Sequence, residues 1–243
     1  MSRYGLIGKN IEYSFSKIFF TNKFESEKTA HSYHNFDIEN IVQFKRICNK
    51  NTDLKGLNIT IPYKQEIIQY LDTIDKEAQA IGAVNTVKFL NDGTLVGYNT
   101  DHYGFRKALA SFPALKSKTA LILGTGGASK AIKYVLDSMG FKYIVVSRSK
   151  TKETITYNQL TKDIIESHTL IVNTTPLGVA PNISECPNIP YEFINQEHFL
   201  FDLIYNPTQT AFLKHGLNKG ATISNGIKML EYQAEKSWSI WNN

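Results

Sequence analysis

The sequence predicts an α/β protein organised as two domains. Short apolar strands alternate with helical segments along most of the chain, which favours a parallel sheet covered by helices on both faces. A glycine-rich turn joins one of these strands to a helix in the second half of the chain. A length of 243 residues is enough for one large domain or two modest ones, each with its own core.

The composition narrows the class of protein. Hydrophobic residues make up 42% of the chain, and no apolar run is long enough to span a bilayer. The N-terminus lacks the apolar stretch of a secretory signal, so we expect a cytoplasmic protein. Cys48 and Cys186 do not form a disulfide framework, and no Cys/His cluster has zinc spacing, so we expect no metal. The net charge of +5 is dispersed, which argues against a nucleic-acid-binding tail but suits an anionic substrate or cofactor.

The elements of the first half follow from apolar spacing and turn residues. Helical spacing of Ile18, Phe19 and Phe24 predicts a helix, and Asn91-Asp92-Gly93 supplies the turn of a hairpin. In order, the expected elements are strand Arg3–Gly8, helix Phe15–Ser26, strand His31–Asp37, helix Ile41–Cys48, strand Leu54–Ile61, helix Glu77–Ile81, and hairpin strands Asn85–Leu90 and Thr94–Tyr98.

The second half continues the alternation after a boundary. Helix Asp101–Phe112 has Thr100 or Asp101 as its N-cap, and Pro113 with the basic stretch Lys116–Lys118 marks the boundary. The expected elements that follow are strand Thr119–Leu123, a helix ending at Gly140, strands Tyr143–Ser147, Leu170–Asn173 and Phe199–Ile204, helix Thr210–Leu217, strand Ala221–Ser224 and helix Gly226–Trp241. Four prolines in Pro176–Pro190 indicate an exposed loop.

One lysine is expected at a position that is unfavourable for a cation. In the run GLNITIPYK, Gly56 to Lys64, the strand ends at Pro62 and a helical pattern follows. Proline fits the first turn of that helix, which places Lys64 in the same turn. A cation is disfavoured there because a helix N-terminus carries partial positive charge. Lys64 is therefore a candidate functional residue, and a solvated surface lysine is the alternative.

The glycine-rich turn indicates a dinucleotide site. Gly124 permits the tight turn, and Gly126 lets the backbone approach a pyrophosphate held by the helix N-terminus. Gly127 and Ala128 complete the turn, and Ser129 occupies the third position of the G-x-G-x-x-G pattern. The position between a predicted strand and a predicted helix favours a Rossmann-type cofactor domain over a purely structural turn.

The residues at the end of the next expected strand, Tyr143–Ser147, indicate whether the cofactor is NAD or NADP(H). An NAD site usually has an acidic residue there for the ribose diol, whereas this chain has the sequence Ser147 to Lys152 (SRSKTK) without a carboxylate. Arg148 and Lys152 can pair with a 2′-phosphate, and Ser149 can hydrogen-bond to it. This pattern predicts NADP(H), and the alternative is a solvated basic turn.

Seven motifs, in order, resemble the shikimate dehydrogenase family nearly end to end. They are Gly8–Ser16 (GKNIEYSFS), Asn58–Lys64 (NITIPYK), Ile81–Thr86 (IGAVNT), Gly97–Asp101 (GYNTD), Asn173–Gly178 (NTTPLG), Asp202–Pro207 (DLIYNP) and Gly226–Gln233 (GIKMLEYQ).

The resemblance implies roles for the substrate-binding residues. Ser14 and Ser16 would hold the substrate carboxylate, and their i, i+2 spacing in extended chain places both hydroxyls on one side. Lys64 and Asp101 would be the catalytic pair. The other substrate-binding residues that it implies are Thr60, Asn85, Tyr205 and Gln233. Each of these has a simpler structural role as an alternative, as a cap, turn former or core aromatic.

The resemblance also implies an activity and a domain organisation. The activity is reversible NADPH-dependent reduction of 3-dehydroshikimate to shikimate, on the route to chorismate and the aromatic amino acids. Residues 1–100, joined by 226–243, would bind substrate, residues 101–225 would bind NADP(H), and the site would lie in the cleft between them. Further cofactor-binding residues implied by the motifs are Ser147, Thr174, Gly226 and Met229. The expected assembly is a monomer or homodimer.

The chain departs from the family pattern at a few positions. Asn10 and Lys17 stand where the family usually has proline, and Tyr13 stands where it has histidine. Ser147 replaces a common asparagine and Ser129 a common alanine. None of these positions belongs to the catalytic pair.

Three rival functions remain open at this stage. They are a quinate/shikimate dehydrogenase that uses NAD, a methylenetetrahydrofolate dehydrogenase, and a non-catalytic binding or regulatory homologue. Arg148 and Lys152 argue against NAD. The paired serines with Thr60, Lys64 and Asp101 suit a polyhydroxy acid better than a folate.

Overall fold

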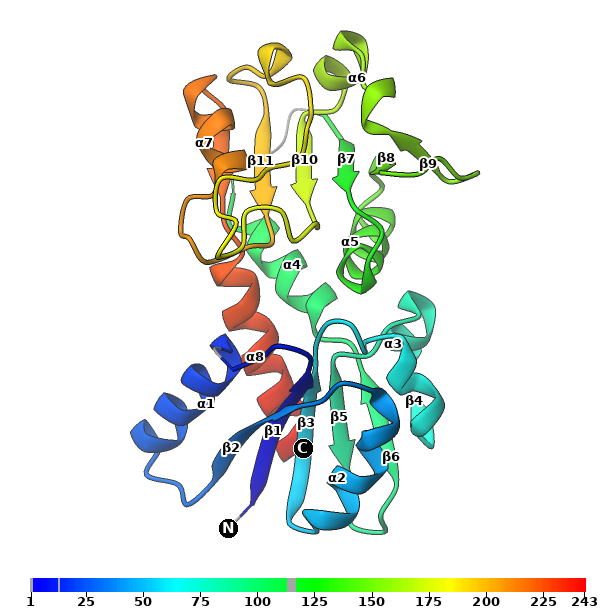
Figure 1. The fold of residues 1–243 in the computed structure, drawn as a ribbon, viewed down its shortest axis with the longest axis vertical. Coiled ribbons are helices and arrows are strands. Elements are labelled where there is room, and N and C mark those ends of the chain that lie inside the picture. Colours follow the sequence, from blue (N-terminus) through cyan, green and yellow to red (C-terminus); the bar gives the residue numbers. More distant parts are fainter. Residues whose placement is uncertain (1, 13, 113–116) are drawn as a thin grey trace. The chain divides into compact units, whose positions relative to one another are not determined.

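The structure is a computed structural model that describes residues 2–12, 14–112 and 117–243. The expectations that fall on Tyr13, Pro113 and Lys116 lie outside these residues. The chain divides into two compact units, Met1–Gly104 with Leu230–Asn243, and Phe105–Met229 (Figure 1). Within the described ranges, no helix is long and apolar enough to cross a membrane.

The first unit is built on a mixed six-stranded sheet in the order β2-β1-β3-β5-β6-β4. Strands β1, β2 and β3 are parallel, and β5 runs antiparallel to both β3 and β6. Its strands are β1 (Arg3–Gly8), β2 (Ser32–Asp37), β3 (Leu54–Ile59), β4 (Thr73–Ile74), β5 (Thr86–Phe89) and β6 (Leu95–Tyr98). Its α-helices are α1 (Phe15–Ser26), α2 (Phe44–Lys50), α3 (Lys76–Ile81), the start of α4 (Asp101–Ala110) and most of α8 (Ile227–Asn242), with short 3-10 helices η1 (Ile41–Gln43) and η2 (Glu66–Tyr70).

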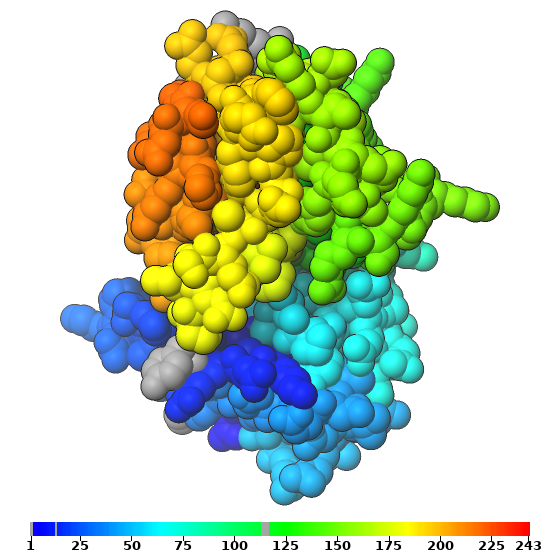
Figure 2. Space-filling view, turned by 45° about the horizontal axis from the view of Figure 1, so that its top comes forward, coloured from blue at the N-terminus to red at the C-terminus, as the bar shows by residue number. Residues whose placement is uncertain are grey.

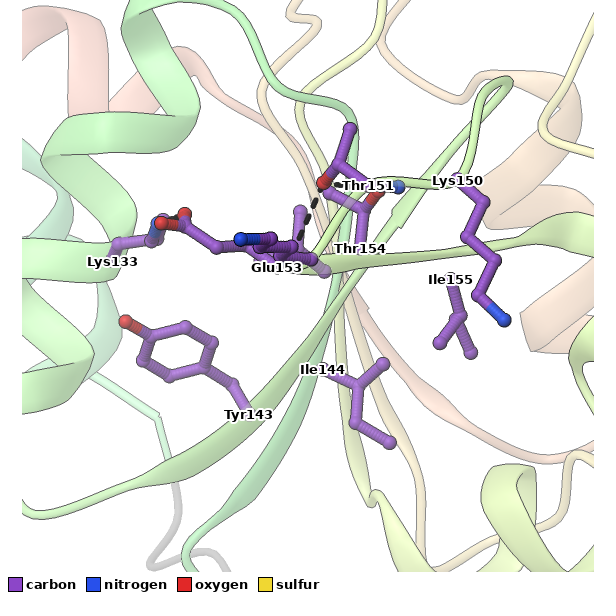
Figure 3. A pocket seen from close by; sticks show the side chains of 10 residues that line it. Lys133, Tyr143, Ile144, Lys150, Thr151, Glu153, Thr154 and Ile155 are labelled. Carbon is purple, nitrogen blue, oxygen red and sulfur yellow. Dashed lines mark hydrogen bonds and ion pairs between the residues drawn. The ribbon is translucent and has the colours of Figure 1, made fainter.

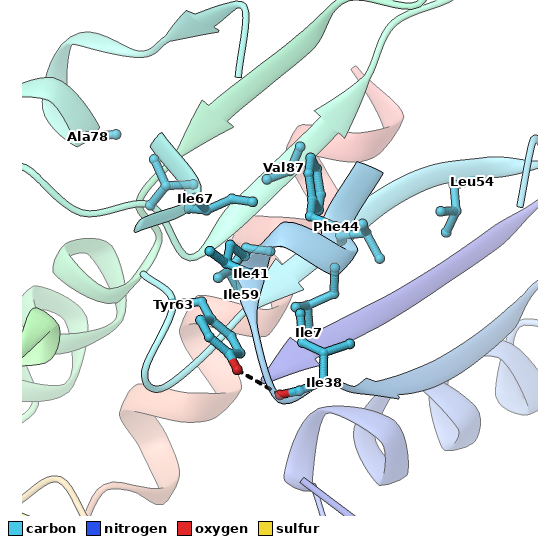
Figure 4. Close-up of a cluster of buried hydrophobic side chains, with 12 residues drawn as sticks. Ile7, Ile38, Ile41, Phe44, Leu54, Ile59, Tyr63, Ile67, Ala78 and Val87 are labelled. Atoms are coloured by element: carbon cyan, nitrogen blue, oxygen red, sulfur yellow. Dashed lines mark hydrogen bonds between the residues drawn. The ribbon is translucent and has the colours of Figure 1, made fainter. Parts of the chain in front are cut away.

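An apolar core fills one side of this sheet. Ile7 and Ile59 from neighbouring strands pack with Phe44 of α2 and Ile67 of η2, all four at most 1% exposed (Figure 4). Each such side chain contributes about 1.5–3 kcal/mol by leaving water. The phenol of Tyr63 joins this core and donates a 2.7 Å hydrogen bond to the Ile38 carbonyl. The segment after β3 is thereby fixed to the first unit.

A second cluster joins α8 to the same unit. Trp241 stacks on Tyr4 of β1 with ring centroids 5.0 Å apart, and its Nε1 donates to the Val87 carbonyl at 3.0 Å. A side chain at Gly56 would lie 2.3 Å from the Trp241 ring, so glycine is required where the helix approaches β3. These contacts position the face of α8 that carries Gln233.

The second unit has a fully parallel six-stranded sheet in the order β12-β11-β10-β7-β8-β9. Its strands are β7 (Thr119–Leu123), β8 (Lys142–Ser147), β9 (Thr154–Thr156), β10 (Leu170–Asn173), β11 (Phe199–Asp202) and β12 (Thr222–Ser224). Its helices are the rest of α4, α5 (Gly127–Ser138), α6 (Lys162–Ser167), α7 (Ala211–Asn218) and the first residues of α8, with η3 (Tyr157–Gln159) and η4 (Tyr191–Phe193). Leu121, Ile171 and Phe212 are fully buried in its core. The predicted α/β fold class is confirmed.

The prediction for the segment after β3 is wrong. The strand ends at Ile59, residues 61–65 form turns with a cis Ile61–Pro62 peptide, and η2 begins only at Glu66. Pro62 and Lys64 therefore do not lie in the first turn of a helix. Contacts with distant residues hold this turn, because the Lys64 carbonyl accepts from Val84 N at 2.7 Å and Tyr63 is buried. The unfavourable interaction that we expected between Lys64 and the positive end of a helix dipole is therefore absent.

Smaller differences have local causes. The expected helix Ile41–Cys48 divides into η1 and α2, since Asn40 and Gln43 form a capping box that starts a separate turn. The side chain that accepts from the first turn of α4 is Asn99, at 3.3 Å from His102 N, rather than that of Thr100 or Asp101. Strands β4 and β9 and helix α6 were not expected, because they have six residues or fewer and carry little periodicity. The expected loop 176–190 contains no helix or strand.

Candidate active site

Lys64 and Asp101 form an ion pair in the first unit. Lys64 Nζ lies 2.7 Å from Asp101 Oδ2, and the two side chains are 14% and 7% exposed. Asp101 is the first residue of α4, where the helix N-terminus stabilises a carboxylate. The turn after β3 brings the ammonium to it. A partly desolvated ammonium held in one direction is suited to donate a proton to, or stabilise charge on, an oxygen beside it.

Asn85 fixes the other oxygen of the carboxylate. Its Oδ1 accepts from Thr100 N at 2.7 Å, and because a backbone N–H only donates, the atom that faces it is the oxygen. The amide nitrogen therefore faces Asp101, and Nδ2 donates to Oδ1 at 2.9 Å. Asp101 is thus held by a donor on each of its oxygens.

Gln233 of α8 completes this hydrogen-bonded group. Its Oε1 lies 3.4 Å from Asn85 Nδ2 and 3.3 Å from Thr100 Oγ1. Its Nε2 donates to the Leu230 carbonyl at 3.0 Å. The structure therefore brings together four predicted site residues that are separated in the sequence: Lys64, Asn85, Asp101 and Gln233.

The two serines lie at the start of α1, and the expectation that both are in extended chain is wrong, because Ser16 is the second residue of the helix. Ser14 is its N-cap, with Oγ accepting from Lys17 N at 3.2 Å and donating to Asn35 Oδ1 at 3.0 Å. Burial raises the pKa of the Tyr33 phenol, and the nearby Ser16 hydroxyl opposes the rise. Sequence reasoning missed Asn35, whose Nδ2 also donates to the Ile11 carbonyl at 2.7 Å and so anchors the loop before α1. No local pattern marks that residue.

Thr60 lies directly after β3, at the strand end that leads to Lys64. Its backbone N–H donates to the Ile7 carbonyl at 2.9 Å. A side chain at Gly8 would lie 2.4 Å from its methyl group, so that glycine makes room for Thr60. The side chain is half-buried at the same edge of the sheet as Lys64.

The glycine-rich turn of the second unit has the geometry of an anion-binding loop. Gly124 has φ of +113°, and a Cβ there would lie 2.6 Å from Thr174 Oγ1. Gly126 is the N-cap of α5, and a Cβ there would meet nothing within 4 Å. Ser129 Oγ donates to the Gly126 carbonyl at 2.7 Å and stabilises the turn. The exposed backbone at Gly126 and the first turn of α5, which contains Gly127 and Ala128, fit a bound phosphate.

The basic turn after β8 is exposed, and hydrogen bonds within the turn stabilise it. Thr154 Oγ1 donates to the Ser149 carbonyl at 3.1 Å and accepts from Thr151 N at 3.0 Å. Figure 2 shows the segment between β8 and β9 projecting from the surface. Arg148, Ser149 and Lys152 are exposed there, and Ser147 is half-buried at the strand end.

A groove of about 570 Å³ lies beside this turn (Figure 3). Lys150 and Ile155 lie on one side, and Tyr143 and Lys133 on the other. Burial raises the pKa of Tyr143 to about 12. Lys152 lines the groove, whereas Arg148 and Ser149 do not. The groove therefore does not unite the predicted 2′-phosphate ligands.

Of the remaining predicted residues, Thr174 and Tyr205 lie on the loops after β10 and β11, Gly226 follows β12 and Met229 lies in α8. Thr174 Oγ1 donates to the Leu123 carbonyl at 2.7 Å, and Tyr205 is half-buried. A Cβ at Gly226 would lie 2.1 Å from the Leu203 carbonyl oxygen, so this glycine is required for close packing. Met229 is 5% exposed and packs in the interior.

Sequence reasoning missed a buried carboxylate between these loops. Asp202 is fully buried and accepts from Thr210 Oγ1 at 2.6 Å, Asn173 Nδ2 at 3.0 Å and Ile204 N at 3.1 Å. Burial raises the pKa of Asp202 to about 6, and these hydrogen bonds oppose the rise. Asp202 lies in one of the matched motifs, but the pattern alone gave no signal of its burial.

The fold and the candidate site together indicate the class of protein. A parallel sheet with a glycine-rich strand-to-helix turn, accompanied by a unit that carries a Lys–Asp pair, is the organisation of a two-domain dinucleotide-dependent enzyme. Residues 6–87 match the family model described as the shikimate dehydrogenase substrate binding domain. The chain is 40% identical to "Shikimate dehydrogenase (NADP(+))" of Clostridium beijerinckii, across 99% of this chain and 92% of that protein. The chain belongs to the shikimate dehydrogenase family.

Solved structures agree with this assignment. Shikimate dehydrogenase from Aquifex aeolicus superposes with a TM-score of 0.89 at 35% identity, covering 100% of this chain and 92% of that one. The enzyme from Thermus thermophilus, solved in complex with NADP(H) and shikimate, gives 0.88 at 31% identity, covering 99% and 93%. The Rossmann-type organisation of the cofactor domain is therefore confirmed.

Proposed function

We infer that this chain catalyses the reversible NADPH-dependent reduction of 3-dehydroshikimate to shikimate, a step of aromatic amino-acid biosynthesis. The observation that carries this inference is the Lys64–Asp101 ion pair, oriented by Asn85, in a member of this family. The Thermus thermophilus relative binds both shikimate and NADP(H), which supports the same pair of ligands here.

The residues of the first unit divide the chemistry between them. When hydride reaches the ketone carbon, negative charge grows on its oxygen, and the Lys64 ammonium stabilises and protonates that oxygen. Asp101 keeps the ammonium directed, and Asn85 keeps Asp101 directed. Ser14 and Ser16 hold the substrate carboxylate. Thr60, Asn85, Gln233 and Tyr205 bind the remainder of the substrate.

The second unit holds the cofactor, which supplies the hydride. The pyrophosphate fits the open backbone at Gly126 and the N-terminus of the twelve-residue helix α5. The exposed cations Arg148 and Lys152, with Ser149, bind the 2′-phosphate. The remaining cofactor residues in this proposal are Gly124, Gly127, Ala128, Ser147, Thr174, Gly226 and Met229.

The domain roles follow from the same evidence. Residues 1–100 with 226–243 form the substrate domain, which the family-model match over 6–87 supports, and residues 101–225 form the cofactor domain. The two free cysteines, Cys48 and Cys186, are compatible with a reducing cytoplasm. In this proposal the enzyme works there as a monomer or homodimer, which light scattering at several concentrations distinguishes.

A spectrophotometric assay tests the proposed function. Purified protein is given shikimate with NADP, then shikimate with NAD, then quinate with each cofactor. We expect reduction of NADP with shikimate to have the highest kcat/KM. A clear preference for NAD or quinate identifies a quinate/shikimate dehydrogenase instead, and inactivity with all four pairs identifies a non-catalytic homologue.

A further inference from the structure

A buried hydroxyl lies behind the candidate catalytic group. Ser237 is fully buried and lies one helical turn after Gln233 on α8. Its Oγ lies 3.0 Å from the Gln233 carbonyl oxygen and 3.1 Å from Asn58 Nδ2. The same oxygen lies 2.8 Å from Thr86 Oγ1 and 3.1 Å from Thr100 Oγ1. A hydroxyl has one proton and two lone pairs, so it can satisfy three of these four contacts at a time, and its proton has Thr86 Oγ1 as its nearest acceptor.

Backbone groups fix the direction of the hydrogen bonds on one side of Ser237. Asn58 faces the carbonyl oxygen of Asn85 at 3.3 Å, and because a carbonyl only accepts, the atom that faces it is Nδ2. Asn58 Oδ1 consequently accepts from the Tyr33 phenol at 2.7 Å. A directed chain therefore runs from Tyr33 through Asn58 to Ser237.

The other side of Ser237 leads to the catalytic pair. Thr86 Oγ1 and Thr100 Oγ1 lie 3.1 Å and 3.2 Å from Asn85 Oδ1. That oxygen is the one that accepts from Thr100 N and so turns Nδ2 toward Asp101. Thr86 and Thr100 are both fully buried, which makes misdirected hydrogen bonds costly. When Ser237 donates to Thr86 Oγ1, the single Thr86 proton is left for Asn85 Oδ1, so the orientation of Asn85 depends on a hydroxyl that Ser237 orders.

We propose that Ser237 is a positioning residue that, through Thr86, Thr100 and Asn85, holds Asp101 and Lys64 in their reactive geometry. The structure supports this role because the network consists of side chains at most 7% exposed, apart from its end at Lys64, and they come from β2, β3, β5, α4 and α8 and from the residues directly before β5 and α4. Ser237 does not touch the pair itself, so it acts through the orientation of the pair.

The test compares Ser237→Ala with Ser239→Ala, an exposed serine two residues along the same helix, whose Oγ accepts from Asn243 Nδ2 at 3.2 Å. We expect Ser237→Ala to lower kcat by about tenfold to a hundredfold, as small displacements of catalytic groups do. The KM for NADP should stay unchanged, and the pH profile of kcat should shift. Ser237→Thr, which retains the hydroxyl, should recover most of the activity. Ser239→Ala should match the unsubstituted enzyme.

A second readout does not depend on turnover. The side-chain amide protons of Asn85 should exchange slowly with solvent in the unsubstituted protein and in Ser239→Ala, and faster in Ser237→Ala, as measured by NMR. Thr86→Val removes the hydroxyl between Ser237 and Asn85 without changing the shape of the side chain. It should reproduce both the lower kcat and the faster amide exchange, and it replaces Ser237→Ala in the test if that variant does not fold. Unchanged kcat, pH profile and amide exchange in either folded variant overturn the proposal.

The inference rests on the proposed function, and the two can fail separately. An unsubstituted protein that does not oxidise shikimate contradicts the proposed function, while slow exchange at Asn85 that Ser237→Ala accelerates still supports the positioning role. An active unsubstituted protein with unaffected variants contradicts the positioning role alone.

Discussion

Asp101 receives Lys64 on one carboxylate oxygen at 2.7 Å and Asn85 on the other at 2.9 Å. The two donors leave the carboxylate little rotational freedom. Asn85 therefore fixes the orientation of Asp101, and Asp101 fixes the orientation of the Lys64 ammonium. This relationship explains why a chain segment with no helix at Lys64 still presents that lysine in one orientation.

Replacing the lysine tests its role in proton transfer. Lys64→Ala should lower kcat by about 10²–10⁴-fold, the usual contribution of a general acid, while the Kd for shikimate changes little. Steady-state kinetics and calorimetric binding measure the two quantities. Lys55→Ala, at an exposed lysine of β3, is the matched control. An unchanged kcat in Lys64→Ala would remove this residue from the mechanism.

Ser14 combines a structural role with a proposed binding role, and two substitutions separate them. Ser14→Ala should weaken shikimate binding by about 1.5–3 kcal/mol through a lost hydrogen bond to a charged group. It should also lower the free energy of unfolding by about 0.5–2 kcal/mol, because Ser14 is the N-cap of α1. Ser14→Gly should show the same loss of binding with a loss of stability of only a few tenths of a kcal/mol, as glycine is tolerated at an N-cap. Equal binding in all three proteins contradicts the carboxylate contact.

Arg148 should determine the choice between the two cofactors. Arg148→Ala should raise the KM for NADP by about tenfold to a hundredfold, in line with a charge-assisted contact of about 1.5–3 kcal/mol, and leave the weaker use of NAD unchanged. Initial rates with each cofactor give the comparison. Lys142→Ala, at the exposed start of the same strand, controls for general loss of positive charge. If both substitutions act equally, the 2′-phosphate is not held by Arg148.

Asp202 should make stability depend on pH. Its pKa in the folded protein is about 6, above the value of about 3.9 expected for an unfolded aspartate. The folded state therefore binds the proton more tightly, so this contribution is fully present below pH 4 and is lost as the pH rises through about 6. The loss is on the order of 3 kcal/mol.

Urea unfolding between pH 4 and pH 7 measures this effect. The free energy of unfolding of Asp202→Asn relative to the unsubstituted protein should rise across that interval, because asparagine does not ionise. A difference that stays constant with pH shows that Asp202 does not titrate there.

The elements with strong local signals were predictable from the sequence. Strand Arg3–Gly8, helix Phe15–Ser26, and strands Thr119–Leu123 and Leu170–Asn173 have the expected bounds. Each is an apolar run or a periodic segment bounded by turn residues, so neighbouring residues alone define it. The ordered series of motifs likewise indicated the family, which the comparisons confirm.

The parts that escaped prediction depend on distant contacts. The turn that carries Lys64 is held by Val84 N and by burial of Tyr63, and neither is visible in the local pattern. The direction of Asn85 follows from Thr100 N, and the burial of Asp202 follows from Asn173 and Thr210. Such networks form only when separate segments meet, so a single sequence identifies their members by residue type but not their partners.

The return of α8 to the first unit has a consequence for biosynthesis of the protein itself. Gln233, Ser237 and Trp241 all belong to residues 230–243, which complete a unit that otherwise ends at Gly104. A nascent chain still attached to the ribosome has Lys64 and Asp101 long before it has the helix that orders their surroundings. The first unit therefore reaches its final packing only after residues 230–243 have been synthesised, and a chain that stops before Leu230 has Lys64 and Asp101 without the helical segment that completes their unit.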